Sequence, residues 1–370
     1  MDIAKTFPKR NASDLVSMVT IAFALLSSKC RSQIQSINWS PDFVNRPLSR
    51  ECGIRAIDLF CGAGGSSWGA REAGVAIVAA FDLCTLAGAT HDANFPETVF
   101  VAGRLEDLDA GKLARRFGSI DLILASPECT NHSPAKGNKP RSEQSKDTAF
   151  QVVRFAKAFR PRWLVIENVV NMRNWTRYSE FKTSLEKLGY NLEEQILNSE
   201  HFGVPQSRKR LFLIADNQKV PSKVTRRKTK AMMVSQILDL NASYRWTPLR
   251  SDKRAKATLE RADRGISAIG KKKPFLIVYY GSDGAGGWQK LNRPLRTITT
   301  VDRFALVKPD KVHGHVMRML QVPELQAAMG MPRKMKFDSG TRRERIKLIG
   351  NGVCPPVMRQ VVKQLIFGKS

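Results

Sequence analysis

The chain alternates short runs of apolar, often β-branched residues with longer segments in which apolar residues recur at helical spacing. The first run, 54–60 (IRAIDLF), precedes a glycine-rich turn at 61–65 (CGAGG) and a predicted helix at 66–74. Further strands are predicted at 75–82, 98–102, 120–125, 162–169 and 208–215, and further helices at 85–95, 111–117, 149–160 and 178–189. Strands that alternate with helices of this length indicate β-α-β units. We therefore predict an α/β fold with a doubly wound parallel sheet.

The alternation stops after Asn217. Residues 218–273 contain basic clusters and one helix-like stretch, 231–240, and residues 274–307 contain strands broken by a glycine-rich turn. The last stretch returns to a turn followed by a helix. The predicted organisation is an N-terminal extension (1–52), a first domain (53–216), a smaller basic domain (217–312), a hinge (313–340) and a C-terminal segment that returns to the first domain (341–370).

The N-terminal extension contains 16–28 (VSMVTIAFALLSS), which loosely resembles the core of a signal peptide. This segment is too short and too interrupted to span a bilayer, and nothing after it looks like a cleavage site. We interpret 1–52 as an extension of unknown role. A helix that packs on the body of the protein and a start codon placed too far upstream are both open alternatives.

The net charge of the chain says more about its partners than the rest of its composition does. The chain has 61 Lys and Arg against 33 Asp and Glu, a formal net charge of +28. This excess favours a polyanionic partner, with nucleic acid first; an anionic membrane surface and no special partner are the alternatives. The six cysteines lie far apart without a Cys-x-x-Cys pair. We therefore expect no metal site and no disulfide framework, and a reducing cytoplasm as the compartment.

Chemically useful side chains lie at the ends of three predicted strands, and two of these ends are at the carboxyl edge, where open α/β folds place their active sites. Cys129 follows the strand at 120–125, and Glu167 lies at the end of the strand at 162–169. Arg208 and Arg210 alternate on one strand and so share a face. Cations near a thiol favour the nucleophilic thiolate. The structural alternatives are a small buried residue for Cys129 and an ion pair for Glu167 with the arginines.

A second group points to a cofactor. The glycine-rich turn between the first strand and the first helix lets a ligand approach the backbone and the helix N-terminus. Asp82 ends the next strand, where a carboxylate can accept hydrogen bonds from ribose hydroxyls. The turn lacks the Gly-x-Gly-x-x-Gly spacing of dinucleotide enzymes. The pattern predicts a nucleoside-containing cofactor, with a tight turn of no further role as the alternative.

Seven segments, in order along the chain, resemble the cytosine-C5 DNA methyltransferase family of bacterial or phage type. They are DLFCGAGG, FDLCTLAGATHDANFP, SPECTNHS, RPRWLVIENV, FGVPQSRKR, RPLRTITT and IGNGVCPP, and together they run from about Ile54 to Val362. The resemblance implies a Rossmann-like S-adenosylmethionine-dependent methyltransferase sheet. It also implies that 53–216 is the catalytic domain and that the basic domain, 217–312, is the target-recognition domain.

The resemblance implies a reaction as well. Cys129 would attack C6 of a cytosine flipped out of duplex DNA, C5 would take the methyl group of S-adenosylmethionine, and loss of the C5 proton would expel the thiolate. Glu167 would hold N3 and the exocyclic amine, Arg210 would reach the base O2, and Arg208 would brace the site. The residues that match cofactor positions are Phe60, Gly62, Gly64, Gly65, Asp82, Asn351 and Gly352. The loop 130–147 would close over the DNA.

The family also implies the setting of the enzyme. It would act as a monomer without a metal, either beside a cognate restriction endonuclease or as a solitary DNA methyltransferase. Two alternatives stay open. One is the same chemistry on tRNA, and the other is a DNA-binding protein that keeps the fold without the activity.

Two positions depart from the family pattern. Glu128 stands directly before Cys129, where the family normally has proline, and a carboxylate beside a thiol raises the thiol pKa. Our hypothesis is that Glu128 points away, or pairs with a base from the recognition domain or from DNA. Arg104 stands where the family usually has an acid that faces the adenine amine. The adenine contact is therefore open, as is a more anionic relative of S-adenosylmethionine as cofactor.

Overall fold

The computed structural model describes residues 53–127, 147–226, 231–240, 243–280, 284 and 286–368. Residues 52–370 form one compact unit. The expectations for the extension 1–52, for Glu128 and Cys129, and for nearly all of the loop 130–147 lie outside the described residues. Among the helices that are described, none combines the length and the apolar content needed to cross a membrane.

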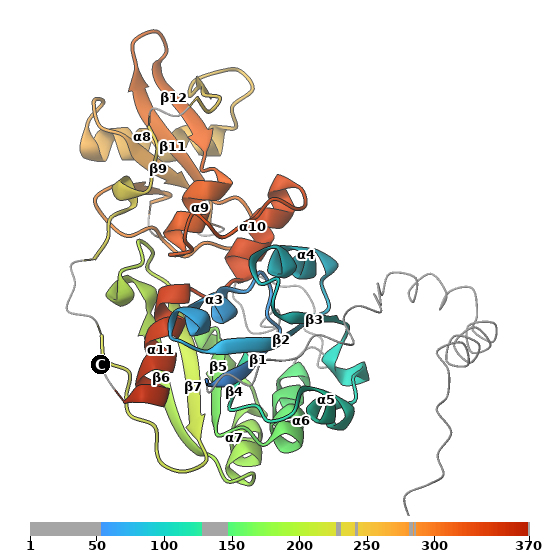
Figure 1. Cartoon of the computed structure of the whole chain (residues 1–370). Helices are drawn as coiled ribbons and strands as arrows, with labels where there is room; N and C mark the ends of the chain where they lie inside the picture. Colours follow the sequence, from blue (N-terminus) through green and yellow to red (C-terminus); the bar gives the residue numbers. More distant parts are fainter. Residues whose placement is uncertain are drawn as a thin grey trace, which may run out of the picture. The chain divides into compact units, whose positions relative to one another are not determined.

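A seven-stranded sheet forms the centre of the unit, in the order β3-β2-β1-β4-β5-β7-β6 (Figure 1). Its strands are β1 (Arg55–Leu59), β2 (Ala76–Asp82), β3 (Val99–Ala102), β4 (Leu122–Ala125), β5 (Trp163–Asn168), β6 (Asn191–Asn198) and β7 (Lys209–Asp216). The five strands β1 to β5 are parallel, as the alternation predicts. Their carboxyl ends therefore meet at one edge, which positions the site described below.

The other half of the sheet differs from the prediction. β7 is antiparallel to both of its neighbours, β5 and β6. β6 was not predicted at all, because it is an edge strand whose acidic and amide side chains interrupt its apolar pattern and whose first six residues stay partly exposed. A link of only ten residues, 199–208, joins β6 to β7. So short a link makes an antiparallel pair, whereas a parallel pair needs a crossover of a dozen or more residues.

Helices cover both faces of the large sheet. They are α3 (Gly65–Glu72), α4 (Thr85–Asn94), α5 (Ala110–Phe117), α6 (Phe150–Phe159), α7 (Tyr178–Glu186) and α11 (Pro355–Phe367). Residues of α3 and α11 pack in one apolar core, and residues of α5, α6 and α7 pack in a second core across the sheet. Asp109 is the N-cap of α5: its carboxylate accepts a hydrogen bond from the Lys112 N–H.

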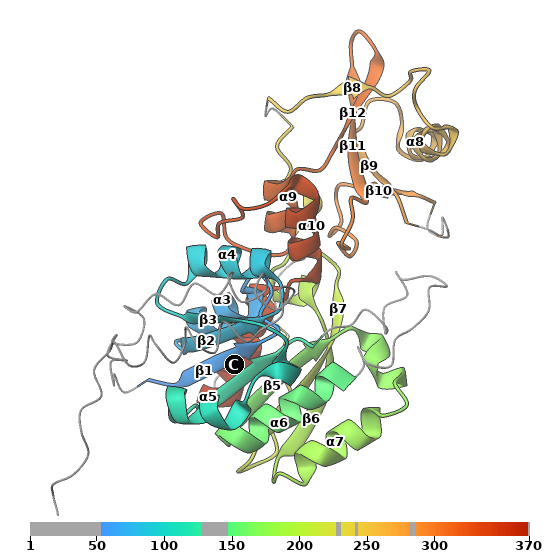
Figure 2. The same cartoon turned by 90° about the vertical axis from the view of Figure 1, so that its right-hand side faces the viewer.

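A second, antiparallel sheet has the order β10-β9-β11-β12-β8, with α8 (Lys256–Ile269) packed on it (Figure 2). Its strands are β8 (Thr247–Pro248), β9 (Phe275–Val278), β10 (Trp288–Lys290), β11 (Phe304–Asp310) and β12 (Gly314–Met319). β12 lies in this sheet although the sequence places a hinge at 313–340. The domain boundaries themselves stay a prediction.

The prediction of a helix at 231–240 is wrong. Only a 3-10 turn forms there, at Val234–Gln236, because the Val234 and Ser235 N–H groups donate to the carbonyls of Arg293 and Leu291. Tertiary pairing thus overrides local propensity. The helix of this region is α8 instead. Its apolar stripe is interrupted by Gly265, which the Phe275 ring contacts closely, and by charged residues that hide the periodicity.

A short stretch of backbone pairing, here called the seam, joins Gln206 and Ser207 before β7 to Leu295 between β10 and β11. Gln206, just before β7, bridges Leu295 in a parallel arrangement, and the Ser207 N–H donates to the Leu295 carbonyl at 2.8 Å. The chain then continues through β11 and β12 to α9 (Val322–Ala328) and α10 (Arg342–Asn351). A Thr341–Glu344 capping box begins α10. The seam therefore joins the segment between β10 and β11 to the residues that directly precede Arg208 and β7.

Candidate active site

The glycine-rich turn after β1 requires unusual backbone conformations. Phe60, Gly62 and Gly64 all have positive φ, at 58°, 52° and 85°. A Cβ at Gly64 would lie 2.6 Å from the Phe95 ring, and one at Gly65 would lie 2.3 Å from the Val353 carbonyl oxygen. Only glycine fits these two places. The tight turn leads the backbone directly into the N-terminus of α3.

Asp82, at the end of β2, holds this turn. One carboxylate oxygen accepts a hydrogen bond from the Gly62 N–H at 2.9 Å, and the other accepts from the Cys84 N–H at 2.8 Å. The side chain stays partly exposed, and each oxygen keeps a second lone pair for a ligand hydroxyl. The acid therefore has a structural role that sequence reasoning missed, and it remains available for the ribose contact.

The last two predicted cofactor positions approach the turn from another element. Asn351 ends α10 with an exposed side chain, and Gly352 follows it. The Val353 carbonyl lies against Gly65, so this segment and the start of α3 are neighbours. An added Cβ at Gly62 would meet no atom within 4 Å. Open backbone at a helix N-terminus beside a carboxylate fits a nucleoside-containing ligand.

Arg104 is exposed and lies 3.9 Å from Glu106.

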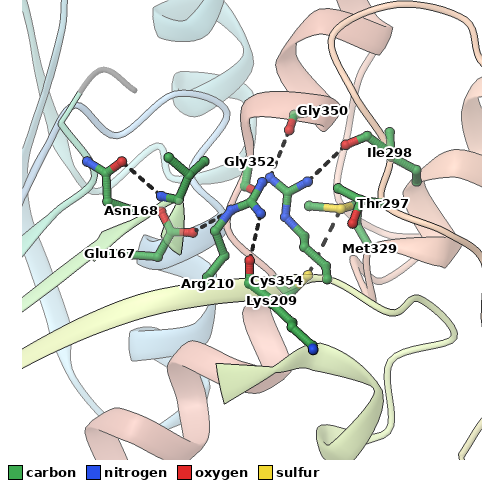
Figure 3. Close-up of polar contacts among 12 residues, drawn as sticks. Glu167, Asn168, Lys209, Arg210, Thr297, Ile298, Met329, Gly350, Gly352 and Cys354 are labelled. Carbon is green, nitrogen blue, oxygen red and sulfur yellow. Dashed lines mark hydrogen bonds and ion pairs between the residues drawn. The ribbon is translucent and has the colours of Figure 1, made fainter. Parts of the chain in front are cut away.

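Glu167 and Arg210 meet at the other part of the edge. Glu167 lies in β5 and is buried, and its Oε1 is 3.2 Å from Arg210 Nε, as Figure 3 shows. Burial raises the pKa of the Glu167 carboxyl, while Arg210 and Arg208 pull that pKa back down. Desolvation outweighs the two arginines, so the neutral form is more accessible than in an exposed glutamate. A neutral carboxyl can donate a hydrogen bond, whereas an ionised one only accepts.

The chain leading to the predicted nucleophile is tied to this pair. The Asn168 side-chain amide, next to Glu167, donates to the Pro127 carbonyl at 3.2 Å. Pro127 is the last described residue after β4, and Cys129 follows it by two positions. The ends of β4 and β5 are therefore fixed to each other at the edge where the sequence places both Cys129 and Glu167.

Arg208 has different partners from Arg210. It is buried, and its guanidinium donates to the carbonyls of Ile298, Gly350 and Gly352 at 2.9, 2.8 and 3.1 Å. Figure 3 shows the dashed contacts to Ile298 and Gly350 on elements far from β7 in sequence. The structure therefore brings both arginines to the site: Arg210 forms an ion pair with Glu167, and Arg208 donates to backbone carbonyls. Arg208 braces the seam and the segment that carries Asn351.

A second thiol lies close to the same pair. Cys354 lines a small cavity of about 10 Å³ together with Glu167 and Arg210. Burial raises the pKa of the Cys354 thiol to about 11, although Arg208 and Arg210 oppose the shift. Cys354 is therefore a neutral thiol near pH 7 and a poor nucleophile.

Two groups near the site were missed in the sequence. Asp58, in β1, is buried, and it accepts hydrogen bonds from the hydroxyl and the N–H of Ser67, at 2.6 and 3.1 Å. Ser67 Oγ also lies 3.3 Å from His91 Nε2. Asp58 Oδ1 and His91 Nδ1 have no hydrogen-bond partner in the part of the chain that is described. An aspartate inside an apolar strand was the available signal for this network.

Gln206 is the other missed residue. Its amide donates to the Ala328 carbonyl at 3.2 Å and accepts from the Ile298 N–H at 3.0 Å. It is fully buried in the seam. The described ranges hold no group of three His, Cys, Asp or Glu side chains that could bind a metal ion.

Several known proteins resemble this chain. The Entamoeba histolytica methyltransferase EhMeth has a similar fold, with a TM-score of 0.61 and 17% identity, over 86% of this chain and 100% of that one. The type II methyltransferase M.HindV of Haemophilus influenzae is 26% identical over 85% of this chain and 96% of its own length.

Two further relatives match about half of the chain. The type II methyltransferase M.AgeI of Thalassovita gelatinovora is 31% identical, but the match spans 50% of this chain and only 46% of that protein. A human tRNA (cytosine(38)-C(5))-methyltransferase is 27% identical over 45% of this chain and 44% of its own. The family model for C-5 cytosine-specific DNA methylases matches residues 54–367. The chain that carries the glycine turn and the paired Glu167 and Arg210 therefore belongs to the C-5 cytosine-specific DNA methylase family.

Proposed function

We propose that this protein methylates C5 of cytosine in duplex DNA, with S-adenosylmethionine as the methyl donor and Cys129 as the nucleophile. The observation that carries the proposal is the buried Glu167–Arg210 pair, fixed through Asn168 to the chain segment that leads to Cys129. A target base inside the double helix is sterically closed to such a pair. The cytosine must therefore leave the stack before it can enter the site.

The proposed chemistry needs a group that stabilises the negative charge that builds on the cytosine ring. The Cys129 thiolate forms a bond to C6, and negative charge builds in the ring. Glu167, whose pKa is raised by burial, supports a protonated carboxyl that hydrogen-bonds N3 or shares its proton with it. Arg210 would reach the adjacent O2. Once C5 has been methylated, loss of its proton returns the electron pair that releases the thiolate.

The cofactor is proposed to lie along the glycine turn. When bound, S-adenosylmethionine supplies the methyl group. The backbone of Phe60, Gly62, Gly64 and Gly65 would border it, Asp82 would accept from the ribose hydroxyls, and Asn351 with Gly352 would close the other side. Arg208 is proposed as a positioning residue, because its guanidinium donates to three backbone carbonyls of the surrounding segments.

The biological setting is proposed from the relatives alone. Type II methyltransferases such as M.HindV support the modifying half of a restriction–modification pair, with a solitary enzyme as the alternative. A cytoplasmic monomer is proposed on the same family basis.

RNA is the second candidate substrate. The relative that methylates tRNA supports it, and net charge does not separate the two nucleic acids. Parallel assays on unmethylated duplex DNA and on unmodified tRNA distinguish the two. Product on DNA supports the proposal, and product on tRNA alone moves the substrate to RNA. If neither becomes methylated, a trap with DNA that contains 5-fluorocytosine tests for an inactive binder: without a covalent complex, the enzymatic proposal fails.

A further inference from the structure

The small cavity beside Glu167 is lined mainly by side chains without charge. Its volume of about 10 Å³ leaves room for about one water molecule at most. Glu167, Arg208 and Arg210 supply the charged part of the lining. The rest of the lining is Leu197, Ser199, Phe212, Val353, Cys354 and Val357. The last three of these belong to the segment that begins α11, and the proposed reaction gives them no role.

A helix that begins beside a carboxyl group ordinarily stabilises the charged form of that group. The first N–H groups of a helix lack partners within the helix, and the helix dipole is positive at that end. α11 begins at Pro355 with Cys354 as its N-cap, and both Cys354 and Val357 line the cavity. An ordinary helix start at this place would therefore hold Glu167 as a carboxylate.

The start of α11 lacks the usual donors. Pro355 and Pro356 occupy its first two positions, and proline has no backbone N–H. The next two N–H groups, of Val357 and Met358, donate to the Cys354 carbonyl at 3.1 and 3.2 Å. Residues 355–358 therefore leave no free N–H group for Glu167.

The N-cap residue itself is an unusual choice. Ser, Thr, Asp and Asn are preferred at this position, because their side chains accept hydrogen bonds from the first turn. Cys354 makes no such bond, and its Sγ lies 4.0 Å from Met329 Sδ. A neutral thiol is a much weaker donor than a hydroxyl group. The side chain of Cys354 therefore keeps this part of the cavity apolar.

Ser199 is the neutral lining residue that could donate to Glu167, and its proton is already used. Its hydroxyl group donates to the Gln206 carbonyl at 2.5 Å. The titratable groups that line the cavity with Glu167 are thus Arg208, Arg210 and the Cys354 thiol. The two arginines lower the pKa of Glu167, and burial raises it. How apolar the remaining lining is therefore decides how far burial prevails.

From these contacts, and on the basis of the proposed function, we infer that Cys354 is a positioning residue for the methyl transfer. Together with Pro355 and Pro356 it forms a helix start that offers Glu167 no hydrogen-bond donor stronger than a thiol. The carboxyl group thus keeps a proton available for N3 of the cytosine, although two arginines and a helix N-terminus lie beside it. Cys354 acts through Glu167 and forms no bond to the substrate.

The variants Cys354→Thr and Cys354→Val test this inference, because the two side chains share a shape and differ in one hydroxyl group. Threonine brings a donor to the cavity, which stabilises the carboxylate. The single-turnover rate of methylation of duplex DNA is measured against pH, and it should decline as Glu167 loses its proton. This decline should lie about one pH unit lower with threonine than with valine, a rate about tenfold lower on the alkaline side.

Two further measurements distinguish this role from a purely structural one. Threonine is a preferred N-cap, so the Cys354→Thr protein should melt no lower than the Cys354→Val protein, and a weaker fold would not explain its slower rate. The infrared band of the protonated carboxyl group, assigned by its loss in Glu167→Gln, gives the midpoint of the Glu167 titration without turnover. That midpoint should also be lower with threonine than with valine.

The outcomes separate this inference from the proposed function. If the wild type methylates duplex DNA while the two Cys354 variants share one alkaline decline and one infrared midpoint, the inference is overturned and the proposed function stands. A higher midpoint with threonine also overturns it. If the wild type does not methylate duplex DNA, the proposed function has failed. A lower infrared midpoint with threonine then still supports the control of Glu167 by the start of α11, and equal midpoints overturn it.

Discussion

Burial beside two arginines sets Glu167 apart from the exposed carboxylates of the described chain. Its pKa is raised by desolvation although two arginines act on it, whereas exposed acids such as Glu180 have a lowered pKa. A raised pKa is useful only where proton sharing with a substrate is needed. At the scale of single residues, Glu167 is therefore the group on which the proposed chemistry depends most after Cys129.

Replacing Glu167 tests this dependence. Glu167→Gln keeps the shape and an oxygen acceptor for Arg210 but removes the ionisable proton, so we expect the single-turnover methylation rate to fall by about 100-fold or more. Glu194→Gln is the control, because Glu194 also forms ion pairs, with Arg173 and Lys182, away from the site. A Glu167→Gln rate within a few-fold of that control would contradict the role.

His91 carries a prediction about pH. Burial lowers the pKa of its imidazole from 6.5 to about 4, so the unfolded chain takes up a proton in this window before the folded protein does. Stability is therefore lost as pH falls from 6.5 toward 4. Near pH 5 this amounts to about 2 kcal/mol. Asp58 acts in the opposite sense: burial raises the pKa of its carboxyl to about 7, so ionisation weakens the fold as pH rises.

His91→Phe separates the two effects. Phenylalanine can retain the stack on Phe95, where the ring centroids are 4.4 Å apart, while Asp58 stays in place. The free energy of unfolding is measured by urea titration at neutral pH and near pH 5. The variant should lose less stability on acidification than the wild type. Identical losses in the two proteins would show that His91 is not the acid-sensitive group.

At the scale of elements, glycines decide how closely helices approach one another. Gly69 of α3 faces α11, and an added Cβ there would lie 2.5 Å from the Pro355 carbonyl and 2.8 Å from Met358 Cβ. In an exposed helix the change to alanine would stabilise, but here it forces the two helices apart. We expect Gly69→Ala to lower the free energy of unfolding by about 1–3 kcal/mol.

Gly53 provides the comparison, because a Cβ there meets no atom within 4 Å. Gly53→Ala should change the unfolding free energy little. If both variants have the wild-type stability in urea titrations, the close approach of α3 to α11 does not control packing as the structure indicates.

An element can be predicted from the sequence when local apolar periodicity determines it, and not when contacts with distant residues do. Strands β1 to β5 and their helices were predictable because apolar periodicity is a local signal. The edge strand β6 and helix α8 were missed, since their apolar faces are diluted by charged residues. The helix predicted at 231–240 does not form, because the backbone there pairs with Arg293 and Leu291, which are distant in sequence. For the site, the alternation of Arg208 and Arg210 was visible in the sequence, but their separate partners were not.

At the scale of the whole molecule, Arg208 links three distant parts of the chain. It connects the start of β7 with the seam at Ile298 and with the end of α10 at Gly350 and Gly352. Arg208→Lys keeps the charge but cannot reach all three carbonyls, and each unsatisfied buried carbonyl costs about 1–3 kcal/mol.

Because Gly352 neighbours the proposed cofactor positions, the substitution has a readout besides stability. We expect Arg208→Lys to raise KM for S-adenosylmethionine several-fold more than it lowers kcat. Steady-state kinetics with varied cofactor, together with a melting curve, check this. A loss of kcat with unchanged KM would instead mean that Arg208 acts on the reacting base.

The account depends most on whether the chain transfers a methyl group to cytosine in DNA through Cys129. The most direct measurement is nucleoside mass spectrometry of unmethylated duplex DNA incubated with the protein and S-adenosylmethionine, with Cys129→Ser as the matched control. The account predicts 5-methyldeoxycytidine with the wild-type protein and none with the control. Equal product with both proteins, or none from DNA that the wild type demonstrably binds in the presence of the cofactor, would contradict it.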